Sequence, residues 1–437
     1  MHHPWIFSER TLTDNEDLFK YMISDNPVRV LLVPDVIRGD DSGAVSARFT
    51  ASLLYNLGYD LAVYAYQDTA ARNASPIECS FRFFPRRPSS TIHHFWGGKV
   101  NSEFEEILAD YRPDYVFFAG MAINKPYHFF KTCIRKKIPF VLLFYINDYY
   151  CSRVYAGLRD GPCFKCVNGN YVHAYVNKCL RKRPYTVQFL KSALVLHRLK
   201  GVLHKCHKVL GYSNNQLTLY ERYGFAPEQC IKSPVHFNNE CIQNVESSRG
   251  DYFVLCGQSS IEKGWHLMAD VVRSCPAAHF KFVFPTKAIA EKQVHVFGLQ
   301  EFVNSGQIEI VTDMKEHDDL MTLLSGARGV LIPSNYPTTG EFVMMESLGL
   351  GKPVIVFDAG IHADIIRSGE NGLMAKIGDV HAFARHINNL NSDEELYCKL
   401  AKGARLLFEE LNSFERLAVS ARQALQSTRL KSHETRL

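Results

Sequence analysis

Two successive series of alternating strand and helix patterns most strongly constrain the fold of this 437-residue chain. The first opens with "VRVLLVP" at residues 28–34, a nearly continuous apolar run typical of a parallel strand covered on both faces. The second opens with "YFVLCG" at 252–257, after an Asn- and Ser-rich segment at 234–250 that we interpret as a linker. This alternation predicts an α/β protein with two doubly wound parallel sheets facing each other across a cleft.

The length also exceeds what one ordinary hydrophobic core supports, which again favours two domains. Ligands of doubly wound sheets lie beyond the carboxyl ends of the strands, so residues with a chemical role should follow strands. We divide the chain into an N-terminal extension (1–26), a first domain (27–235) with a basic, cysteine-containing insertion at about 149–208, a second domain (250–412) and a C-terminal helical tail (413–437).

Composition points to a globular protein of a reducing compartment. Hydrophobic residues make up 46% and charged residues 22%, and no apolar run approaches the roughly 18 residues that span a bilayer. The N-terminus lacks the basic segment and apolar core of a signal peptide, and twelve cysteines without an export signal favour free thiols. We therefore expect a cytoplasmic protein.

Charge is distributed unevenly along the chain. No acidic residue lies between Asp160 and Glu221, whereas that stretch holds ten Lys or Arg residues. Residues 186–208 are patterned as a helix with Lys191, Arg198 and Lys205 on one face, opposite Phe189, Leu190, Leu194, Leu199 and Leu203. This pattern fits either a solvated face packed on a core or peripheral attachment to an anionic membrane. Without a known nucleic-acid-binding motif, it does not favour nucleic acid.

An acid stands in an apolar helix pattern in "YPTTGEFVMMESLGLGKPVIVFDAG" (336–360). Glu346 there would cost several kcal/mol if ionised without hydrogen-bond donors. One interpretation is a salt bridge to Lys352 or to an arginine. The other is a diol, such as a nucleotide ribose, whose two hydroxyls both donate to the carboxylate.

The residues before this helix pattern form a Thr-x-x-Glu box. Thr338 is expected to cap the helix while Glu341 reaches back to it, which would make Glu341 structural. Gly340 leaves room for close backbone approach, and the free N–H groups of a helix start suit a phosphate.

A cation occupies the corresponding place after the first strand of the second series. In "CGQSSIEKGWHLM", Lys263 falls between that strand and a helix expected to begin near Gly264. A cation at a helix N-terminus is slightly unfavourable on its own, and a bound diphosphate reverses the sign. The alternative is an exposed loop lysine.

Several segments resemble the retaining glycosyltransferases of family 4. "IPSNYPTTGEFVMMESLGLGKPVIVFDAGIHADIIRSGENGLMAKIGD" looks like the donor-binding signature of that family, and "CGQSSIEKGW" resembles its G-R-x-x-x-x-K-G element. "GDDSGAVSARFTASLLYNLGYDLAVYA" and "HKVLGYSNNQLTLYERYGF" are similar to N-terminal segments. The resemblance covers most of the chain and implies the GT-B fold, with two Rossmann-like domains.

By resemblance, individual residues acquire expected roles. Glu346 matches the acid that contacts the nucleotide ribose, and Lys263 matches the lysine on the donor diphosphate. Gly43 matches the glycine loop that approaches the phosphates and the reacting sugar. The backbone amides around Thr339 and Gly340 match those that hold the diphosphate.

Three positions depart from the family pattern. Thr338 stands where the family has the glutamate that contacts the donor sugar, and Gln258 replaces the diphosphate arginine. Asn147, next to Asp148, stands in place of a histidine. Glu341 substitutes for the missing glutamate if the loop is shifted. These changes fit a divergent enzyme with unusual donor handling or an impaired one.

Four cysteines in the insertion have metal-ligand potential. Cys151, Cys163, Cys166 and Cys179 follow a C-x11-C-x2-C-x12-C spacing, which would suit a structural zinc site. The alternative is a set of free thiols in an insertion near the acceptor side.

The sequence therefore predicts an enzyme that moves a sugar from a nucleotide-diphosphate sugar to a glycan or lipid-linked acceptor, in cell-surface polysaccharide or glycoconjugate synthesis. By resemblance the chemistry needs no cofactor, and no Asp-x-Asp motif that would hold a metal occurs. A nucleotide-sugar epimerase of the same fold and a weakly active sugar-binding member are the alternatives.

Overall fold

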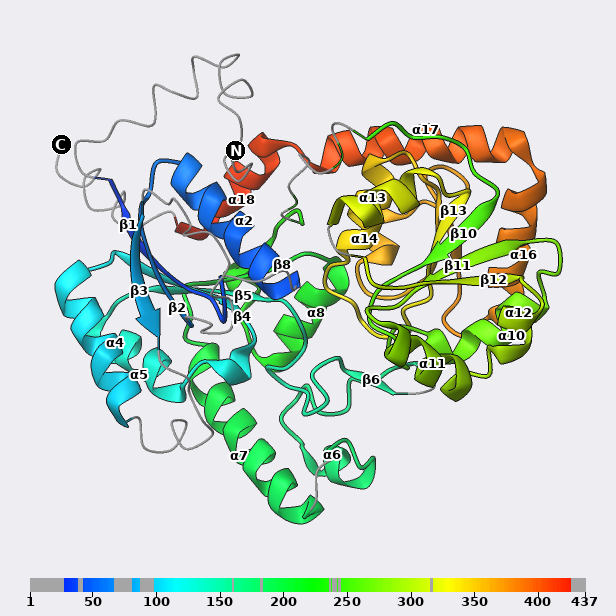
Figure 1. Cartoon of the computed structure of the whole chain (residues 1–437). Coiled ribbons are helices and arrows are strands. Elements are labelled where there is room, and N and C mark those ends of the chain that lie inside the picture. Colours follow the sequence, from blue (N-terminus) through cyan, green and yellow to red (C-terminus); the bar gives the residue numbers. More distant parts are fainter. Residues whose placement is uncertain are drawn as a thin grey trace.

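The computed structural model places two parallel sheets side by side (Figure 1). The residues that the structure describes are 27–37, 42–66, 81–86, 98–158, 161–180, 184–235, 237, 242, 245–314 and 317–425. The predicted extension at 1–26 lies outside these ranges, as does Gly39, the first residue of the segment "GDDSGAVSARFTASLLYNLGYDLAVYA".

The N-terminal sheet has seven strands in the order β3-β2-β1-β4-β5-β8-β9, and all pairings are parallel. Side chains of β1 alternate between two hydrophobic cores, Val30 and Leu32 on one face and Leu31 and Val33 on the other. Burial on both faces explains the continuous apolar run in the sequence. The strands are β1 (Arg29–Val33), β2 (Asp60–Tyr66), β3 (Arg82–Arg86), β4 (Tyr115–Gly120), β5 (Phe140–Phe144), β8 (Lys208–Gly211) and β9 (Cys230–Lys232). The helices are α2 (Ser42–Asn56), α4 (Gly98–Tyr111), α5 (Tyr127–Lys136) and α8 (Asn214–Tyr223), with short 3-10 turns at Ala122–Asn124 and Pro227–Gln229.

The second sheet has six parallel strands in the order β12-β11-β10-β13-β14-β15. Its strands are β10 (Tyr252–Leu255), β11 (His279–Val283), β12 (Ile308–Val311), β13 (Gly329–Ile332), β14 (Val354–Phe357) and β15 (Leu373–Ala375). Its helices are α10 (Met268–Arg273), α11 (Lys287–Val296), α12 (Gln300–Asn304), α13 (His317–Ser325), α14 (Phe342–Gly349), α15 (His362–Ile365), α16 (Val380–Ser392) and α17 (Glu394–Leu411), with a 3-10 turn, η4, at Trp265–Leu267.

Strand order reverses between β1 and β4 in the first sheet and between β10 and β13 in the second. Loops on either side of such a reversal diverge and leave room for a ligand at the carboxyl ends of the strands. The segments after β10 and β13 carry the predicted donor-binding residues, so the topology brings Lys263 and the 333–341 loop to the same place.

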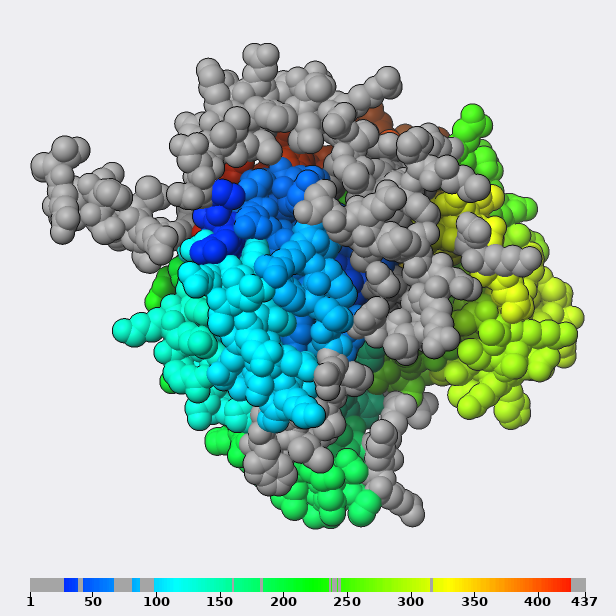
Figure 2. All heavy atoms as spheres, turned by 60° about the vertical axis from the view of Figure 1, so that its left-hand side comes forward, coloured from blue at the N-terminus to red at the C-terminus, as the bar shows by residue number. Residues whose placement is uncertain are grey.

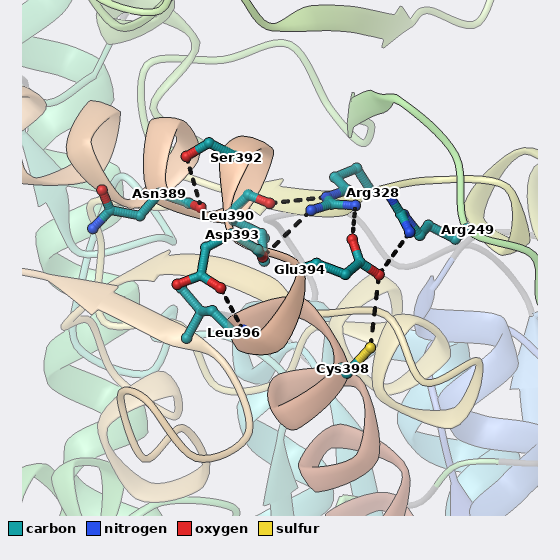
Figure 3. Close-up of polar contacts among 9 residues, drawn as sticks. All are labelled: Arg249, Arg328, Asn389, Leu390, Ser392, Asp393, Glu394, Leu396 and Cys398. Carbon is teal, nitrogen blue, oxygen red and sulfur yellow. Dashed lines mark hydrogen bonds and ion pairs between the residues drawn. The ribbon is translucent and has the colours of Figure 1, made fainter.

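A polar network anchors the opposite, amino end of β13 (Figure 3). Arg328 directly precedes the strand, donates from Nε to the carbonyl of Leu390 over 2.8 Å, and lies 3.0 Å from Glu394. Glu394 also forms an ion pair with Arg249, with 2.7 Å between the carboxylate oxygen and the guanidinium nitrogen. These contacts fasten the junction of α16 and α17 to the sheet, on the side away from the predicted site.

The C-terminal segment returns to the first domain. Helix α18 (Phe414–Leu425) contacts α2, β8 and β9 (Figure 1). Leu417 and Ala418 pack with Leu53 and Leu57 of α2 in a small hydrophobic cluster. The described part of the predicted tail therefore buries an apolar face and joins the two domains.

The insertion contains a short hairpin, β6 (Gly157–Leu158) with β7 (Gly161–Pro162), followed by α6 (Val172–Val176) and α7 (Tyr185–Leu203). Leu199 and Leu203 are buried, as predicted. Leu190 and Leu194, for which the sequence left both a core and a membrane surface open, are 59% and 45% exposed and so do not pack in the core. The first half of α7 extends past the domain body, so its apolar periodicity meets no core there (Figure 1).

Candidate functional site

The loop between β13 and α14 is buried and tightly held. Its backbone bonds to two other loops, with Asn335 N–H donating to the carbonyl of Glu262 over 3.0 Å and Ile361 N–H to that of Thr338 over 3.0 Å. Gly360, at φ +57°, packs so closely that a Cβ would stand 2.2 Å from the Thr338 oxygen. The loop conformation is therefore fixed by segments that follow three neighbouring strands, β10, β13 and β14.

Lys263 and Glu341 form an ion pair inside this site. Lys263 Nζ lies 3.0 Å from Glu341 Oε1, the Glu341 side chain is 2% exposed and that of Lys263 is 25% exposed. The turn carrying Lys263 packs on β13, since a Cβ on Gly264, which has a φ of +76°, would stand only 1.9 Å from the Pro333 oxygen. Lys263 is thus not the exposed loop lysine of the alternative interpretation.

Two further groups surround the Glu341 carboxylate. Ser334 Oγ donates to Oε1 over 2.6 Å, and His362 Nε2 lies 3.8 Å from the same oxygen. His362 is fully buried, and its Nδ1 lies 2.9 Å from the carbonyl of Phe357. Burial lowers the pKa of His362 despite the opposing pull of Glu341. The imidazole is therefore neutral near pH 7, with Nδ1 donating to Phe357.

Electrostatics favour the charged forms of the pair. Burial is the largest single influence and acts to raise the pKa of Glu341, but Lys263, His362 and Ser334 together act in the opposite direction, and the net shift is downward. Burial likewise acts to lower the pKa of Lys263, and Glu341 and Tyr336 reverse the direction and raise it. Lys263 is therefore positively charged, and the exposed part of its side chain is accessible to a ligand.

Thr338 does not cap the helix. Helix α14 begins at Phe342 with Glu341 at the N-cap position and no side-chain cap, so the predicted capping box is wrong. The Thr338 hydroxyl is buried without a hydrogen-bond partner in the described part of the chain. The physical reason is the tie from Ile361 to Thr338, which holds the loop in a non-helical path until Glu341.

Glu346 lies on α14, buried, as the sequence predicted. Its Oε1 is 3.1 Å from Nε2 of His317, the first residue of α13. The predicted alternative partner Lys352 instead donates to the carbonyl of Ser248, so that ion pair is wrong. Burial, and then the negative charges of Glu346 and Glu341, raise the pKa of Cys256, which directly follows β10.

The first domain reaches this loop through residues after β5. Asn147 is buried, and its Nδ2 donates to the carbonyl of Pro337 over 2.9 Å. The Thr339 hydroxyl donates to the carbonyl of Tyr145 in the opposite direction. The Asn147 side-chain oxygen is buried without a hydrogen-bond partner among the described residues. These two hydrogen bonds join the first domain to the loop between β13 and α14.

Buried charges lie behind Asn147. Asp148 accepts from the N–H of Ile123 over 2.9 Å, and Lys125 Nζ lies 2.6 Å from Asp35, which follows β1. Burial raises the pKa of Asp148 to about 7. It lowers the pKa of Lys125, against the attraction of Asp35. These groups sit at the carboxyl ends of β1, β4 and β5, where the sheet topology predicts a ligand.

The remaining predicted residues occupy the edges of the site. Gln258 accepts a 3.1 Å hydrogen bond from the hydroxyl of Tyr155, and nearby Arg153 pairs with buried Glu262 at 3.0 Å. Gly340 is exposed, and a Cβ there would meet no atom closer than 3.9 Å. Gly43 lies in the first turn of α2 and not in the preceding loop as predicted.

The four cysteines of the insertion surround one small cavity, which His173 also lines. Their thiols influence one another, because after burial the neighbouring cysteines contribute to the raised pKa of Cys166 and of Cys151. In the ranges that the structure describes, however, no group of three or more His, Cys, Asp or Glu side chains is arranged to hold a metal ion. The thiols are free in the structure.

Sequence reasoning missed three residues of the site, Ser334, His317 and His362. Ser334 and His362 follow β13 and β14, so their position after buried strands was a usable signal. His317 begins a helix and carries no such signal. Together the site offers a fixed cation, two buried carboxylates and a neutral imidazole beside a helix N-terminus, a set that suits a diphosphate joined to a polyhydroxylated group.

Two facing parallel doubly wound domains, with ion-binding groups at their carboxyl ends, define a GT-B fold. Solved structures agree: the sucrose-phosphate synthase of Thermosynechococcus elongatus superimposes with a TM-score of 0.66 at 15% identity, over 93% of this chain and 100% of that one. HepE of Anabaena, in a complex with UDP-glucose, gives a TM-score of 0.63 at 14% identity over 92% and 99%.

The second domain also matches a protein family by sequence. Residues 244–407 match the family model described as glycosyl transferases group 1. The glycosyltransferase LpsE of lipopolysaccharide core biosynthesis in Rhizobium meliloti (strain 1021) is 34% identical over 85 residues. EpsD of Bacillus subtilis (strain 168) is 41% identical over 78 residues. These matches span 20% and 17% of this chain, and only 25% and 20% of the relatives' own lengths.

Proposed function

We propose that the protein is a retaining glycosyltransferase of the family 4 type. It transfers a sugar from a nucleotide-diphosphate sugar to a glycan or lipid-linked acceptor, releasing the nucleoside diphosphate and a proton. The observation that carries the proposal is the Lys263–Glu341 pair at the start of α14, with Glu346 one turn further along the helix. All three residues fall within the segment that matches the glycosyl transferase family.

Each residue has a role in the proposed reaction. Glu346 accepts hydrogen bonds from the two ribose hydroxyls of the donor. Lys263 and the first N–H groups of α14 stabilise the negative charge that grows on the diphosphate as the anomeric C–O bond breaks. Glu341 keeps Lys263 oriented toward that oxygen. Asn147 contributes from the first domain and joins the two halves around the donor.

The proposal explains two positions at which this sequence departs from the family pattern. Glu341, three residues beyond Thr338, is the carboxylate that reaches the site, so it replaces the glutamate absent at 338. Gln258 removes a positive charge beside the leaving group, and Lys263 is left to carry more of the stabilisation. We place the enzyme in the cytoplasm, at the inner face of the membrane, in synthesis of cell-surface polysaccharide or glycoconjugate. The matched relative of lipopolysaccharide core synthesis supports this assignment.

A thiophilic metal is also part of the proposal. Four thiols around one cavity are the donor set of a structural zinc site, although binding would require them to converge further than they do in the structure. Zinc would hold in place the loop that carries Arg153, which pairs with Glu262 of the second domain. It would take no part in sugar transfer.

The decisive experiment combines binding with turnover. Nucleoside diphosphates and their sugars are screened for thermal stabilisation of the purified chain, and hits are assayed for nucleotide release with and without candidate acceptors. Acceptor-dependent release, with the donor's anomeric configuration kept in the product by NMR, supports the proposal. Sugar isomerisation without release identifies an epimerase, and stabilisation without either reaction identifies a binding protein.

A further inference from the structure

Exposed apolar side chains are concentrated at one end of the insertion. Among the described residues, eleven large hydrophobic side chains are exposed, and six of these lie between positions 172 and 194. We call this region the α6–α7 tip, defined by Val172, Tyr175, Val176, Val187, Leu190 and Leu194. Exposure reaches 68% at Val176 and 61% at Val172. Scattered single residues of this kind need no explanation, whereas a cluster marks an interaction surface.

The tip is a packed unit. The Tyr175 ring lies 5.4 Å from that of Tyr185 and 5.1 Å from that of Phe189, which joins α6 to the first turns of α7. The Tyr185 hydroxyl donates to the carbonyl of Ala174 over 2.7 Å. Helix α6 and the first half of α7 project away from both sheets, and this end of α7 protrudes at the lower edge of the molecule (Figure 1 and Figure 2).

The exposed stripe of α7 mixes apolar and basic residues. Val187, Leu190, Lys191, Leu194 and His197 are exposed at spacings of three or four, so they share one face of the helix. Lys178, just after α6, is exposed as well. No acidic residue occurs from position 161 to 220. The tip is therefore positively charged, and no acidic residue within this stretch neutralises its lysines.

We propose that the α6–α7 tip inserts into the surface of an anionic lipid membrane. Apolar side chains beside lysines on a short helix suit the boundary between headgroups and acyl chains, where leucine and valine are buried and lysines meet lipid phosphates. A second copy of this chain is a poorer occupant, because it would bring two acid-free basic surfaces together. The inference does not depend on sugar transfer.

One consequence concerns orientation. The tip belongs to the first domain, and α7 packs on the core through Leu196, Leu199 and Leu203. Insertion of the tip would fix the first domain at the membrane and leave the second domain free to move relative to it. No helix in the described ranges is long and apolar enough to cross a bilayer.

Vesicle cosedimentation of the full chain tests the proposal. Vesicles of phosphatidylcholine with phosphatidylglycerol are compared with phosphatidylcholine alone, for the wild type and the pair variant Val187→Gln with Leu190→Gln. We expect the wild type to bind the anionic vesicles more strongly, and the variant to bind them at least about tenfold more weakly, a loss that corresponds to about 1.4 kcal/mol for the two apolar side chains together. Lys191→Gln is expected to weaken binding to the anionic vesicles and leave the neutral ones unaffected.

A matched control separates the tip from general stickiness. Leu406→Gln removes a side chain of nearly equal exposure, 57%, from α17 in the second domain and is expected to bind like the wild type. Thermal unfolding of every variant verifies that the fold is kept. Equal binding by the wild type and the Val187/Leu190 variant overturns the proposal. The proposal is also overturned if the wild type does not bind the vesicles. It is overturned as well if the tip variants lose self-association but keep their lipid binding.

Discussion

The side-chain amide of Asn147, in the first domain, donates a 2.9 Å hydrogen bond to the backbone carbonyl of Pro337, 190 residues further along the chain. Pro337 belongs to the loop that positions Glu341, and Glu341 holds Lys263. The loop between β13 and α14 therefore has its conformation set partly by the second domain and partly by the first. If the domains separate, the hydrogen bond from Asn147 to this loop is broken.

Replacing Asn147 should weaken that coupling. Asn147→Ala removes one interdomain hydrogen bond worth about 1 kcal/mol, so we expect turnover to fall by about fivefold or more, with little change in unfolding temperature. Thr339→Val removes the bond to Tyr145 and tests whether coupling alone accounts for the loss. If Asn147 also contacts the reacting groups, kcat should fall further in Asn147→Ala than in Thr339→Val. Small-angle scattering would check that the two variants close their domains to the same extent.

The Lys263–Glu341 pair allows structure and function to be separated. Lys263→Met leaves a buried carboxylate uncompensated, so we expect a loss of about 3–5 kcal/mol in unfolding free energy and about a 100-fold loss of turnover. Adding Glu341→Gln should restore most of the stability and none of the turnover. Lys281→Met is the matched control, since Lys281 is 26% exposed and pairs with Glu309 at 3.2 Å. Recovery of turnover in the double variant would contradict the role of Lys263 as a ligand cation.

Much of this architecture follows from the sequence, for a physical reason. The near-continuous apolar runs were assigned correctly as parallel strands, because burial on both faces removes polar residues from them. Strand β3 was missed because Arg82, Pro85 and Arg86 interrupt the pattern, as an edge strand permits. Strand β15 is only three residues long, too short for a periodic signal.

The site was less predictable than the fold. Lys263 and Glu341 were recognisable as residues after strands, but their pairing depends on β10 lying next to β13, which no local pattern encodes. The Thr338 box failed because the contact from Ile361 overrides a local capping preference. Leu190 and Leu194 follow a helical period, but no hydrophobic core lies beside that part of the helix. Local patterns therefore predicted elements and missed the contacts that arise between them.

Glu346 can be tested against its structural partner. Glu346→Gln should weaken nucleoside diphosphate binding by about tenfold or more, because a neutral amide accepts ribose hydroxyls less strongly than a carboxylate. His317→Gln removes the residue 3.1 Å away and keeps the carboxylate. Isothermal titration with the nucleotide identified in the screen should show loss only in the Glu346 variant. Similar losses in both variants would assign Glu346 to a structural contact with His317.

Asp148 makes stability depend on pH in a specific direction. Burial raises its pKa to about 7 in the folded chain, whereas an unfolded aspartate has a pKa of about 3.9. Between these values the folded state binds more protons, so this residue's contribution is present at low pH and is lost as pH rises through about 7. Denaturant unfolding of wild type and Asp148→Asn should therefore show a stability difference that shifts in favour of the variant over that window. A difference independent of pH would mean that Asp148 is ionised throughout.

The cysteine cluster predicts a measurable metal content. If the four thiols hold zinc, protein purified without chelator should contain about one zinc per chain by elemental analysis, and Cys163→Ser with Cys166→Ser should lose it. The variant should also loosen the loop that carries Arg153, so hydrogen exchange around residues 151–158 should rise while the second sheet stays protected. Cys275→Ser is the matched control, because this buried cysteine lies in the core of the second domain. Metal-free wild type with four thiols that react only on unfolding would assign the cluster to packing of the insertion.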